Sequence, residues 1–135
     1  MNKLSIGNLL AKVPIIQGGM AVGISKSGLA SAVANAGGIG VIATAGIAHL
    51  ADDLSSNFIE ANNRIFAEEI RKAKSLTRGI IGANIMSALS NYAALAKVAI
   101  KEGIDIIFSG AGLPLSLPSF LPEGNTSTKL VPIVS

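Results

Sequence analysis

The sequence contains no cysteine and no tryptophan, and it has a single histidine among its 135 residues. The absence of cysteine excludes disulfide bonds, thiolate metal sites and a cysteine nucleophile, and it agrees with a reducing compartment such as the cytoplasm. The histidine, His49, lies in a polar loop beside Asp52 and Asp53. A metal site requires more ligands at suitable spacing, and a catalytic triad requires a placed nucleophile. We therefore assign neither metal ligands nor catalytic residues to the chain.

Charged and aromatic side chains are also scarce, at 14% and 4% of the chain. The net charge is +3, but the 11 basic residues are dispersed and form no stripe that alternates with aromatic residues. This distribution argues against a nucleic-acid partner. Half of the residues are hydrophobic, so Ile, Val, Leu and Ala must build the core. Such a composition is typical of strands covered by helices on both faces.

One stretch without formal charge, residues 27–51, is long enough to span a bilayer. However, Asn35 and the glycines at 37, 38 and 40 interrupt it, and the apolar spacing changes there from helical to strand-like. The amino-terminal residues, MNKLSIGNLLAK, are too few and too polar for a signal peptide. We therefore expect a cytoplasmic protein with no membrane partner.

Apolar runs and helical spacing alternate along the chain. The apolar runs predict strands, which are residues 13–17, 39–44, 79–85, 105–109 and 130–134. The first predicted helix begins after a cap at Ser25 or Ser27 and stops at Gly37. The other two run from about residue 58 to 74 and from a cap near Ser90 to Gly103.

The apolar spacing indicates which faces the first two predicted helices should bury. In the first helix, Leu29 lies on the apolar stripe, and in the second Phe58 does. The second helix also places Glu60 four residues before Arg64, and Glu68 four residues before Lys72. This spacing predicts ion pairs on the exposed face of that helix.

Alternating strands and helices predict an α/β protein with about five parallel strands and right-handed crossovers. A closed eight-stranded βα barrel takes ~250 residues. The last predicted strand has no helix after it to cover it. We therefore expect residues 1–135 to form a single partial domain, either an incomplete piece of a larger barrel or one part of a split protein.

Two glycine patterns invite a nucleotide-binding interpretation. Gly38, Gly40 and Ala43 match G-x-G-x-x-A, but they follow a helix and lead into a strand, whereas a dinucleotide loop lies between a strand and the next helix. We interpret them as a helix cap and a tight strand start. Gly110 and Gly112 do follow a strand, but the prolines after them forbid a helix, which favours a loop folded over the mouth of a barrel.

The candidate ligand contacts lie where predicted strands end. Gly18 and Gly19 follow the first strand and offer bare backbone, and Met20 follows them. Asn84 lies near the end of a buried strand, where either loop backbone or a ligand must satisfy its carboxamide. Position alone leaves both answers open. For Ser109 and Ser135, which occupy similar positions, we expect hydrogen bonds to nearby backbone.

Five segments, in order, resemble one family of flavoenzymes. They are PIIQGGM, AVANAGGIGVIA, GANIM, SGAGLPLSLP and VPIVS. Together they resemble the amino-terminal part of the FMN-dependent nitronate monooxygenases, formerly called 2-nitropropane dioxygenases. They resemble more distantly the flavin-containing enoyl-acyl carrier protein reductases of type II. The resemblance covers residues 14–135 and implies the amino-terminal part of a TIM (βα)8 barrel, with FMN at the carboxyl ends of the strands.

The resemblance also implies which residues hold the cofactor. Gly18, Gly19 and Met20 would lie against the flavin ring, and Asn84 would hydrogen bond to it. In the family, the catalytic histidine belongs to a Gly-Gly-His segment after the next strand, and glycine loops of the last two strands bind the phosphate. This sequence contains no such histidine segment, and His49 does not match it.

The resemblance therefore implies a fragment of an oxidoreductase that oxidises alkyl nitronates with oxygen and is inactive alone. Two alternatives stay open. One is a type II enoyl-acyl carrier protein reductase, whose substrate would be an enoyl thioester. The other is a half-barrel binding module that associates with a second copy or with the remainder of a barrel, through exposed strand edges.

Overall fold

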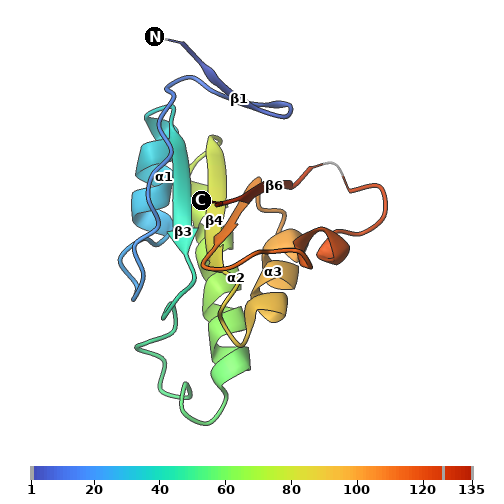
Figure 1. The fold of residues 1–135 in the computed structure, drawn as a ribbon. Helices are drawn as coiled ribbons and strands as arrows, with labels where there is room; N and C mark the ends of the chain where they lie inside the picture. The colour runs from blue at the N-terminus through green and yellow to red at the C-terminus, as the bar shows by residue number, and fades with distance from the viewer. Residues whose placement is uncertain (1, 126, 135) are drawn as a thin grey trace.

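The computed structural model describes residues 2–125 and 127–134. A two-stranded antiparallel hairpin precedes a four-stranded parallel sheet in the order β3-β4-β5-β6, and helices connect three of the parallel strands (Figure 1). The elements are β1 (Leu4–Ile6), β2 (Leu9–Ala11), α1 (Ser27–Asn35), β3 (Ile39–Ala43), α2 (Phe58–Leu76), β4 (Ile80–Met86), α3 (Tyr92–Lys101), β5 (Ile106–Gly110), the 3-10 helix η1 (Leu117–Phe120) and β6 (Lys129–Pro132). The predicted α/β class with parallel strands is confirmed.

The first predicted strand, residues 13–17, is not a full strand. It forms one isolated parallel bridge, between Ile16 and Ile39 of β3. Three backbone hydrogen bonds tie it to the chain around β3, and the last runs from the Gln17 amide to the Ile39 carbonyl at 3.0 Å. The pairing is short because the backbone leaves the sheet directly after Gln17. The sheet therefore has four strands and a bridged edge segment in place of five strands.

The helices cover one face of the sheet only, which corrects the expectation that helices cover both. Ile42 of β3, Ile81 of β4 and Ile107 of β5 point toward the helices and pack with Phe66 of α2 and Leu95 of α3. All five side chains are fully buried or nearly so. These residues form the larger core of the molecule.

The other face of the sheet carries the β1-β2 hairpin, which the sequence analysis did not predict. Its apolar residues pack on Ile39, Ile80 and Ile106, which are the first residues of β3, β4 and β5. The hairpin therefore covers the amino ends of the strands. It lies at the opposite end of the sheet from the long loop that follows β3 (Figure 1). The carboxyl half of this face is left for other contacts.

The start of α1 is satisfied by a distant side chain rather than by the predicted serine cap. Neither Ser25 nor Ser27 caps the helix through its own hydroxyl. Instead, the Ser27 amide donates to the Glu69 carboxylate of α2 at 2.8 Å, and Lys26 lies 3.9 Å from the same carboxylate. A negative charge at a helix amino terminus satisfies free N–H groups and complements the helix dipole. The contact fixes α1 to α2. The third helix starts close to the cap expected near Ser90: Asn91 precedes Tyr92, although its side chain makes no capping hydrogen bond.

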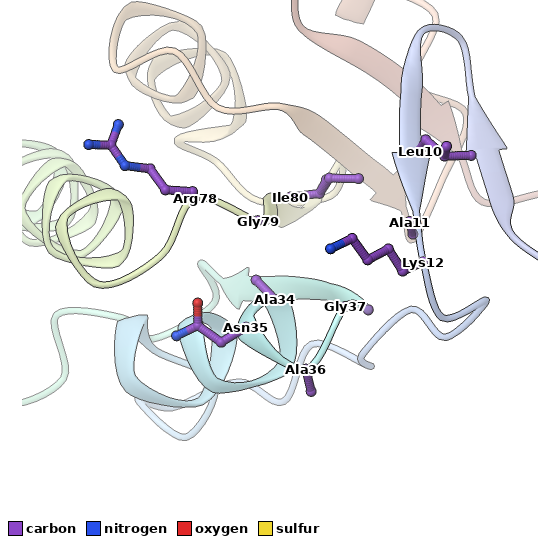
Figure 2. A pocket seen from close by; sticks show the side chains of 11 residues that line it. Leu10, Ala11, Lys12, Ala34, Asn35, Ala36, Gly37, Arg78, Gly79 and Ile80 are labelled. Carbon is purple, nitrogen blue, oxygen red and sulfur yellow. The ribbon is translucent and has the colours of Figure 1, made fainter.

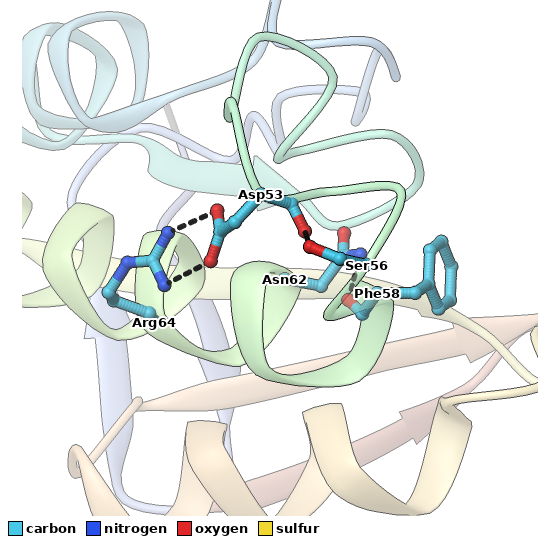
Figure 3. Close-up of polar contacts among 5 residues, drawn as sticks. All are labelled: Asp53, Ser56, Phe58, Asn62 and Arg64. Atoms are coloured by element: carbon cyan, nitrogen blue, oxygen red, sulfur yellow. Dashed lines mark hydrogen bonds and ion pairs between the residues drawn. The ribbon is translucent and has the colours of Figure 1, made fainter.

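Two expectations about the side chains of α1 and α2 are wrong. Leu29 and Phe58 are 45% and 49% exposed rather than buried. Arg64 does not pair with Glu60 but with Asp53 of the preceding loop, through two hydrogen bonds of 3.0 and 2.8 Å (Figure 3). The two carboxylate oxygens of Asp53 match the fork of the guanidinium, a geometry that favours this pair over a single contact along the helix. The hydrogen bond and charge of Arg64 lower the pKa of Asp53.

Among the residues that the structure describes, no helix is both long and apolar enough to cross a membrane.

Candidate functional site

The carboxyl ends of the parallel strands bring together residues that are far apart in the sequence. In the sheet register, Asn84 of β4 lies between Ala43 of β3 and Phe108 of β5. Two residues earlier on the same face, Gly82 leaves room for the Phe108 ring, because a Cβ on Gly82 would lie 2.7 Å from its Cε2 atom. The buried Phe108 ring therefore lies over Gly82, on the same face of the sheet as Asn84.

Gly19 reaches this group from the edge of the sheet. A Cβ built on Gly19 would lie 2.8 Å from the Cβ of Asn84 and 3.4 Å from the Cβ of Ala43. The backbone therefore crosses over the end of β3 and lies against a side chain of the next strand. Only glycine allows this approach without displacing its neighbours. Of the four predicted cofactor contacts, the structure thus brings Gly19 and Asn84 together.

Asn84 uses its backbone, and not its side chain, in the hydrogen bonds that it makes within the described residues. Its backbone carbonyl accepts hydrogen bonds from the Thr44 amide at 3.1 Å and the Thr44 hydroxyl at 3.0 Å. Its half-buried side chain has no hydrogen-bond partner among residues 2–125 and 127–134. The sequence left open whether loop backbone or a ligand satisfies this carboxamide. Within the described residues, loop backbone does not satisfy it. Its donors and acceptor are available to a ligand.

Gln17 explains how the glycines leave the sheet. Its side-chain oxygen accepts from the Val41 amide at 3.1 Å, and its side-chain nitrogen donates to the Val41 carbonyl at 3.0 Å. The carboxamide thus occupies the place of the next pair of backbone hydrogen bonds in the parallel ladder. Within the described residues, the amides of Gly18 and Gly19 donate no hydrogen bond. The sequence alone assigned no role to Gln17, which is the last residue of the first predicted strand.

Ser25 completes the edge of β3. Its hydroxyl accepts from the Met20 amide at 2.9 Å and from the Gln17 side chain at 3.2 Å. Its carbonyl accepts from the Ala43 amide at 3.0 Å. Ser25 is 1% exposed, so these bonds lie away from water. The residue that the sequence suggested as a helix cap instead holds the two ends of the loop 18–25 together.

The remaining candidate residues do not share one environment. Gly18 is exposed, and a Cβ on it would meet nothing within 4 Å. Met20 is 60% exposed beside it. Ser109 points to the helix face, where its buried hydroxyl lies 2.9 Å from the Tyr92 hydroxyl rather than on backbone. Ser135 lies outside the described residues. His49 is exposed, with Nδ1 3.1 Å from the Gly46 carbonyl.

The loop after β5 does not fold over the site as a whole. The segment 117–120 forms η1 and packs on α3, where the rings of Phe120 and Tyr92 meet edge to face at 6.2 Å. Residues 111–113 stay at the carboxyl edge and line a cavity of about 450 Å³ with Ile133 and Val134. The apolar side chains after Pro114 drive η1 toward the helices, which corrects the expected cover over the mouth.

Two residues at this edge hold strained backbone. Val22 has a φ of 54° and Ala111 a φ of 58°, in the loops that follow the bridged segment and β5. For a β-branched residue such as Val22, this conformation is rare and persists only where surrounding contacts impose it. The Val22 amide donates to the Ala45 carbonyl at 2.8 Å, which holds the loop after residue 17 against the loop after β3.

A second cavity, of about 390 Å³, lies at the amino ends of the strands (Figure 2). It is lined by β2, the end of α1 and residues 78–80. Two cationic residues line it, but Arg78 extends away from Lys12 in Figure 2. The carboxamide of Asn35 is already bonded to the Leu76 carbonyl and the Thr77 hydroxyl. Among the described residues that line this cavity, the cationic side chains belong to exposed residues and the one carboxamide already has its partners.

A family model described as nitronate monooxygenase matches residues 3–107. The chain belongs to the nitronate monooxygenase family. Among curated proteins, no sequence matches it. This family is one of FMN-type oxidoreductases.

Two solved structures of FabK from Thermotoga maritima show the same fold as this member of the nitronate monooxygenase family. The M276A mutant is 29% identical, with a TM-score of 0.72, over 93% of this chain and 36% of the mutant chain. The second FabK structure is 28% identical, with a TM-score of 0.66, over 90% of this chain and 34% of that one. The chain thus spans about a third of the FabK chains that it matches. This confirms the predicted partial barrel.

The carboxyl edge also fits the flavin that the family implies. A flat heteroaromatic ring requires nearby hydrogen-bond donors and a surface without obstructing side chains. The unbonded amides of Gly18 and Gly19 and the free carboxamide of Asn84 supply the donors. The exposed Met20 side chain supplies an apolar surface next to them. The residues present are therefore compatible with one edge and one face of such a ring.

Proposed function

We propose that the carboxyl edge of this sheet binds FMN, and that the chain supplies the amino-terminal part of an FMN-dependent nitronate monooxygenase. The observation that carries the proposal is the free carboxamide of Asn84, held against the backbone of Gly19 in a chain of this family. The polar atoms of this half-buried side chain are not enclosed, so they are accessible to water or to a ligand. A ligand that offers both a donor and an acceptor can replace that water.

Each proposed contact has a definite chemical role. Bound FMN would supply the electron-accepting chemistry, which no side chain of this chain can provide. The amides of Gly18 and Gly19 and the carboxamide of Asn84 would bind polar atoms of the ring and stabilise negative charge that develops there. Met20 would pack on the ring and exclude water from it. These residues bind and orient the cofactor, and we assign no proton transfer to them.

A second candidate activity is the reduction of enoyl thioesters, as in type II enoyl-acyl carrier protein reductases. It is favoured by the similarity to FabK, at a TM-score of 0.72. Both activities would use the same flavin edge, and they differ in the electron donor and in the electron acceptor. With FMN bound in the complete barrel, an alkyl nitronate would cause oxygen uptake without added nicotinamide. An enoyl thioester would instead be consumed only with a reduced nicotinamide.

The chain should also associate with further polypeptide, either the remainder of a barrel or a second copy. Leu113, Ile133 and Val134 line the carboxyl-edge cavity and are 72%, 54% and 69% exposed. Leu115, two residues after Leu113, is 84% exposed. Clustered apolar side chains of this kind mark surfaces that other protein covers. Light scattering across a concentration series measures self-association directly. A monomer at all concentrations would leave the remainder of the barrel as the proposed partner.

The cofactor proposal is tested by titrating the chain into FMN and following flavin fluorescence, with Asn84→Ala and Asn62→Ala compared. Asn62 is buried and donates to the Phe58 carbonyl at 2.7 Å, so its carboxamide is already bonded within α2 (Figure 3). Asn84→Ala should weaken FMN binding by about tenfold with little loss of stability. Asn62→Ala should lower stability by about 1 kcal/mol without changing FMN affinity. Equal FMN affinity in Asn84→Ala and the parent would remove Asn84 from the site.

A further inference from the structure

We infer that Gln17 is a positioning residue: its carboxamide takes the place of a backbone pair in the sheet and thereby releases the Gly18 and Gly19 amides toward the ligand. The inference deepens the proposed cofactor site and rests on it for the identity of the ligand. The placement of the loop by Gln17 is a separate claim, which can be measured without any flavin.

The order of hydrogen bonds along β3 shows that the Gln17 side chain replaces backbone groups. The Ile39 amide donates to the Ile15 carbonyl at 2.9 Å, and the Gln17 amide donates to the Ile39 carbonyl at 3.0 Å. In a parallel ladder the next pair would join Val41 to the backbone carbonyl of residue 17 and the backbone amide of residue 19. Instead, the Val41 amide donates to the Gln17 side-chain oxygen at 3.1 Å, and the Val41 carbonyl accepts from the Gln17 side-chain nitrogen at 3.0 Å.

This replacement of backbone hydrogen bonds by the Gln17 side chain has a direct consequence for Gly19. If its amide bonded to Val41, Gly19 would be part of the edge strand and its donor would be consumed. Because the side chain makes that bond, the backbone is free to cross β3 and lie against Asn84. The hydroxyl of Ser25 then holds the far end of the loop by accepting from the Met20 amide. Gln17 and Ser25 also bond to each other, at 3.2 Å, so the two anchors form one network.

The placement is tested by nuclear magnetic resonance on the full chain. In the parent, protons of Gly19 and of the Asn84 side chain should give a cross-relaxation signal, and the Val41 amide should exchange slowly with solvent. In Gln17→Leu, which keeps the bulk and removes both hydrogen bonds, the signal should vanish and Val41 exchange should rise by about tenfold. A signal that persists in a folded Gln17→Leu protein overturns the inference, whether or not FMN binds.

Asn35→Leu is the matched control. The carboxamide of Asn35 also donates to a carbonyl and accepts from a neighbour, but at the amino end of the sheet. We expect it to cost similar stability and to leave the contact of Gly19 with Asn84 unchanged. FMN affinity should fall by about tenfold in Gln17→Leu and stay within about twofold of the parent in Asn35→Leu. Equal FMN affinity in Gln17→Leu and the parent would overturn the inference.

Gln17→Glu provides a second variant with a readout that simple loss of stability would not give. A protonated glutamic acid has one donor and one acceptor in the positions of the amide, whereas the carboxylate has no donor for the Val41 carbonyl. The ratio of variant to parent FMN affinity should therefore rise toward one as the pH falls through the pKa of the new carboxyl. The signal between Gly19 and Asn84 should return over the same pH range. A ratio that does not change with pH contradicts the positioning role.

The two proposals fail separately. If the parent chain binds no FMN but the signal is lost in Gln17→Leu and restored in Gln17→Glu at low pH, the cofactor proposal fails and the positioning of the loop stands. If the parent binds FMN and Gln17→Leu binds it equally well, the cofactor proposal stands and the positioning role fails.

Discussion

The backbone of Gly19 lies so close to Asn84 that a single added carbon would stand 2.8 Å from the Asn84 Cβ atom. The two residues are separated in the sequence by α1, β3, α2 and the first part of β4, yet they meet above the end of β3. The contact has a glycine on one side and an unbonded carboxamide on the other. It combines close backbone approach with free hydrogen-bonding capacity, which are the two properties that a bound ring requires.

The first prediction concerns this contact. Gly19→Ala should destabilise the protein by about 1–2 kcal/mol, because the new methyl group overlaps Asn84 and Ala43. Gly18→Ala is the matched control, since a Cβ there meets nothing within 4 Å. Urea unfolding of the two variants measures the difference. Equal stability of Gly18→Ala and Gly19→Ala would show that the loop does not lie against Asn84.

A second prediction concerns the packing of α1 on β3. A Cβ on Gly40 would overlap the carbonyl oxygen of Ala30, which is backbone and cannot move aside. Gly40→Ala should therefore cost about 3 kcal/mol. Gly28, in the first turn of α1, has open space, so Gly28→Ala should raise stability by about 0.5 kcal/mol through helix propensity. Denaturant unfolding of both variants checks the signs, and a tolerated Gly40→Ala would contradict this packing.

A third prediction concerns the pH dependence of stability. Partial burial raises the pKa of Glu69, but hydrogen bonding to Ser27 and the charges of Lys26 and Lys72 outweigh it and hold the pKa below its ordinary value. Because the folded pKa is lowered, the carboxylate stabilises the fold above its unfolded pKa. This contribution is lost as the pH falls through the folded pKa.

Glu69→Gln should therefore be less stable than the parent by about 0.5–1 kcal/mol at neutral pH, and the difference should shrink in acid below pH 4.5. Urea midpoints measured from neutral pH down to about pH 3 check the trend. Glu123→Gln is the control, because Glu123 is exposed and lies outside this contact. Parallel curves for the parent and Glu69→Gln over the whole range would rule out the proposed cap.

The sequence predicted the parallel strands because continuous apolar runs bounded by glycine are typical of buried strands. It missed the β1-β2 hairpin, although Gly7 and Asn8 form a two-residue turn between short apolar segments. Three-residue strands carry too little periodicity to stand out in a polar terminus. The glycines at 37–40 behave as interpreted: Gly37 ends α1 with a φ of 93°, and Gly40 packs on Ala30.

The candidate site was only partly predictable. Strand ends can be located from the sequence, and this placed Gly19 and Asn84 at one edge before any contact was known. The exposure of Leu29 and Phe58 could not be predicted, because periodicity defines an apolar stripe but not how much of it the neighbouring elements cover. The role of Gln17 also escaped, because a side chain that replaces a backbone hydrogen bond is visible only in the register of the sheet. A glutamine directly before a glycine pair at a strand end was the available signal.

The central claim is that FMN binds at the carboxyl edge formed by the loop after Gln17 and the end of β4. Amide resonances of the chain, recorded while FMN is added, test it most directly. The account predicts that the largest shifts occur at Gly18, Gly19 and Met20 and at the Asn84 side chain, and that Gly37 and Gly79 at the amino edge do not move. Shifts confined to the amino edge, or no shifts at saturating FMN, would contradict it.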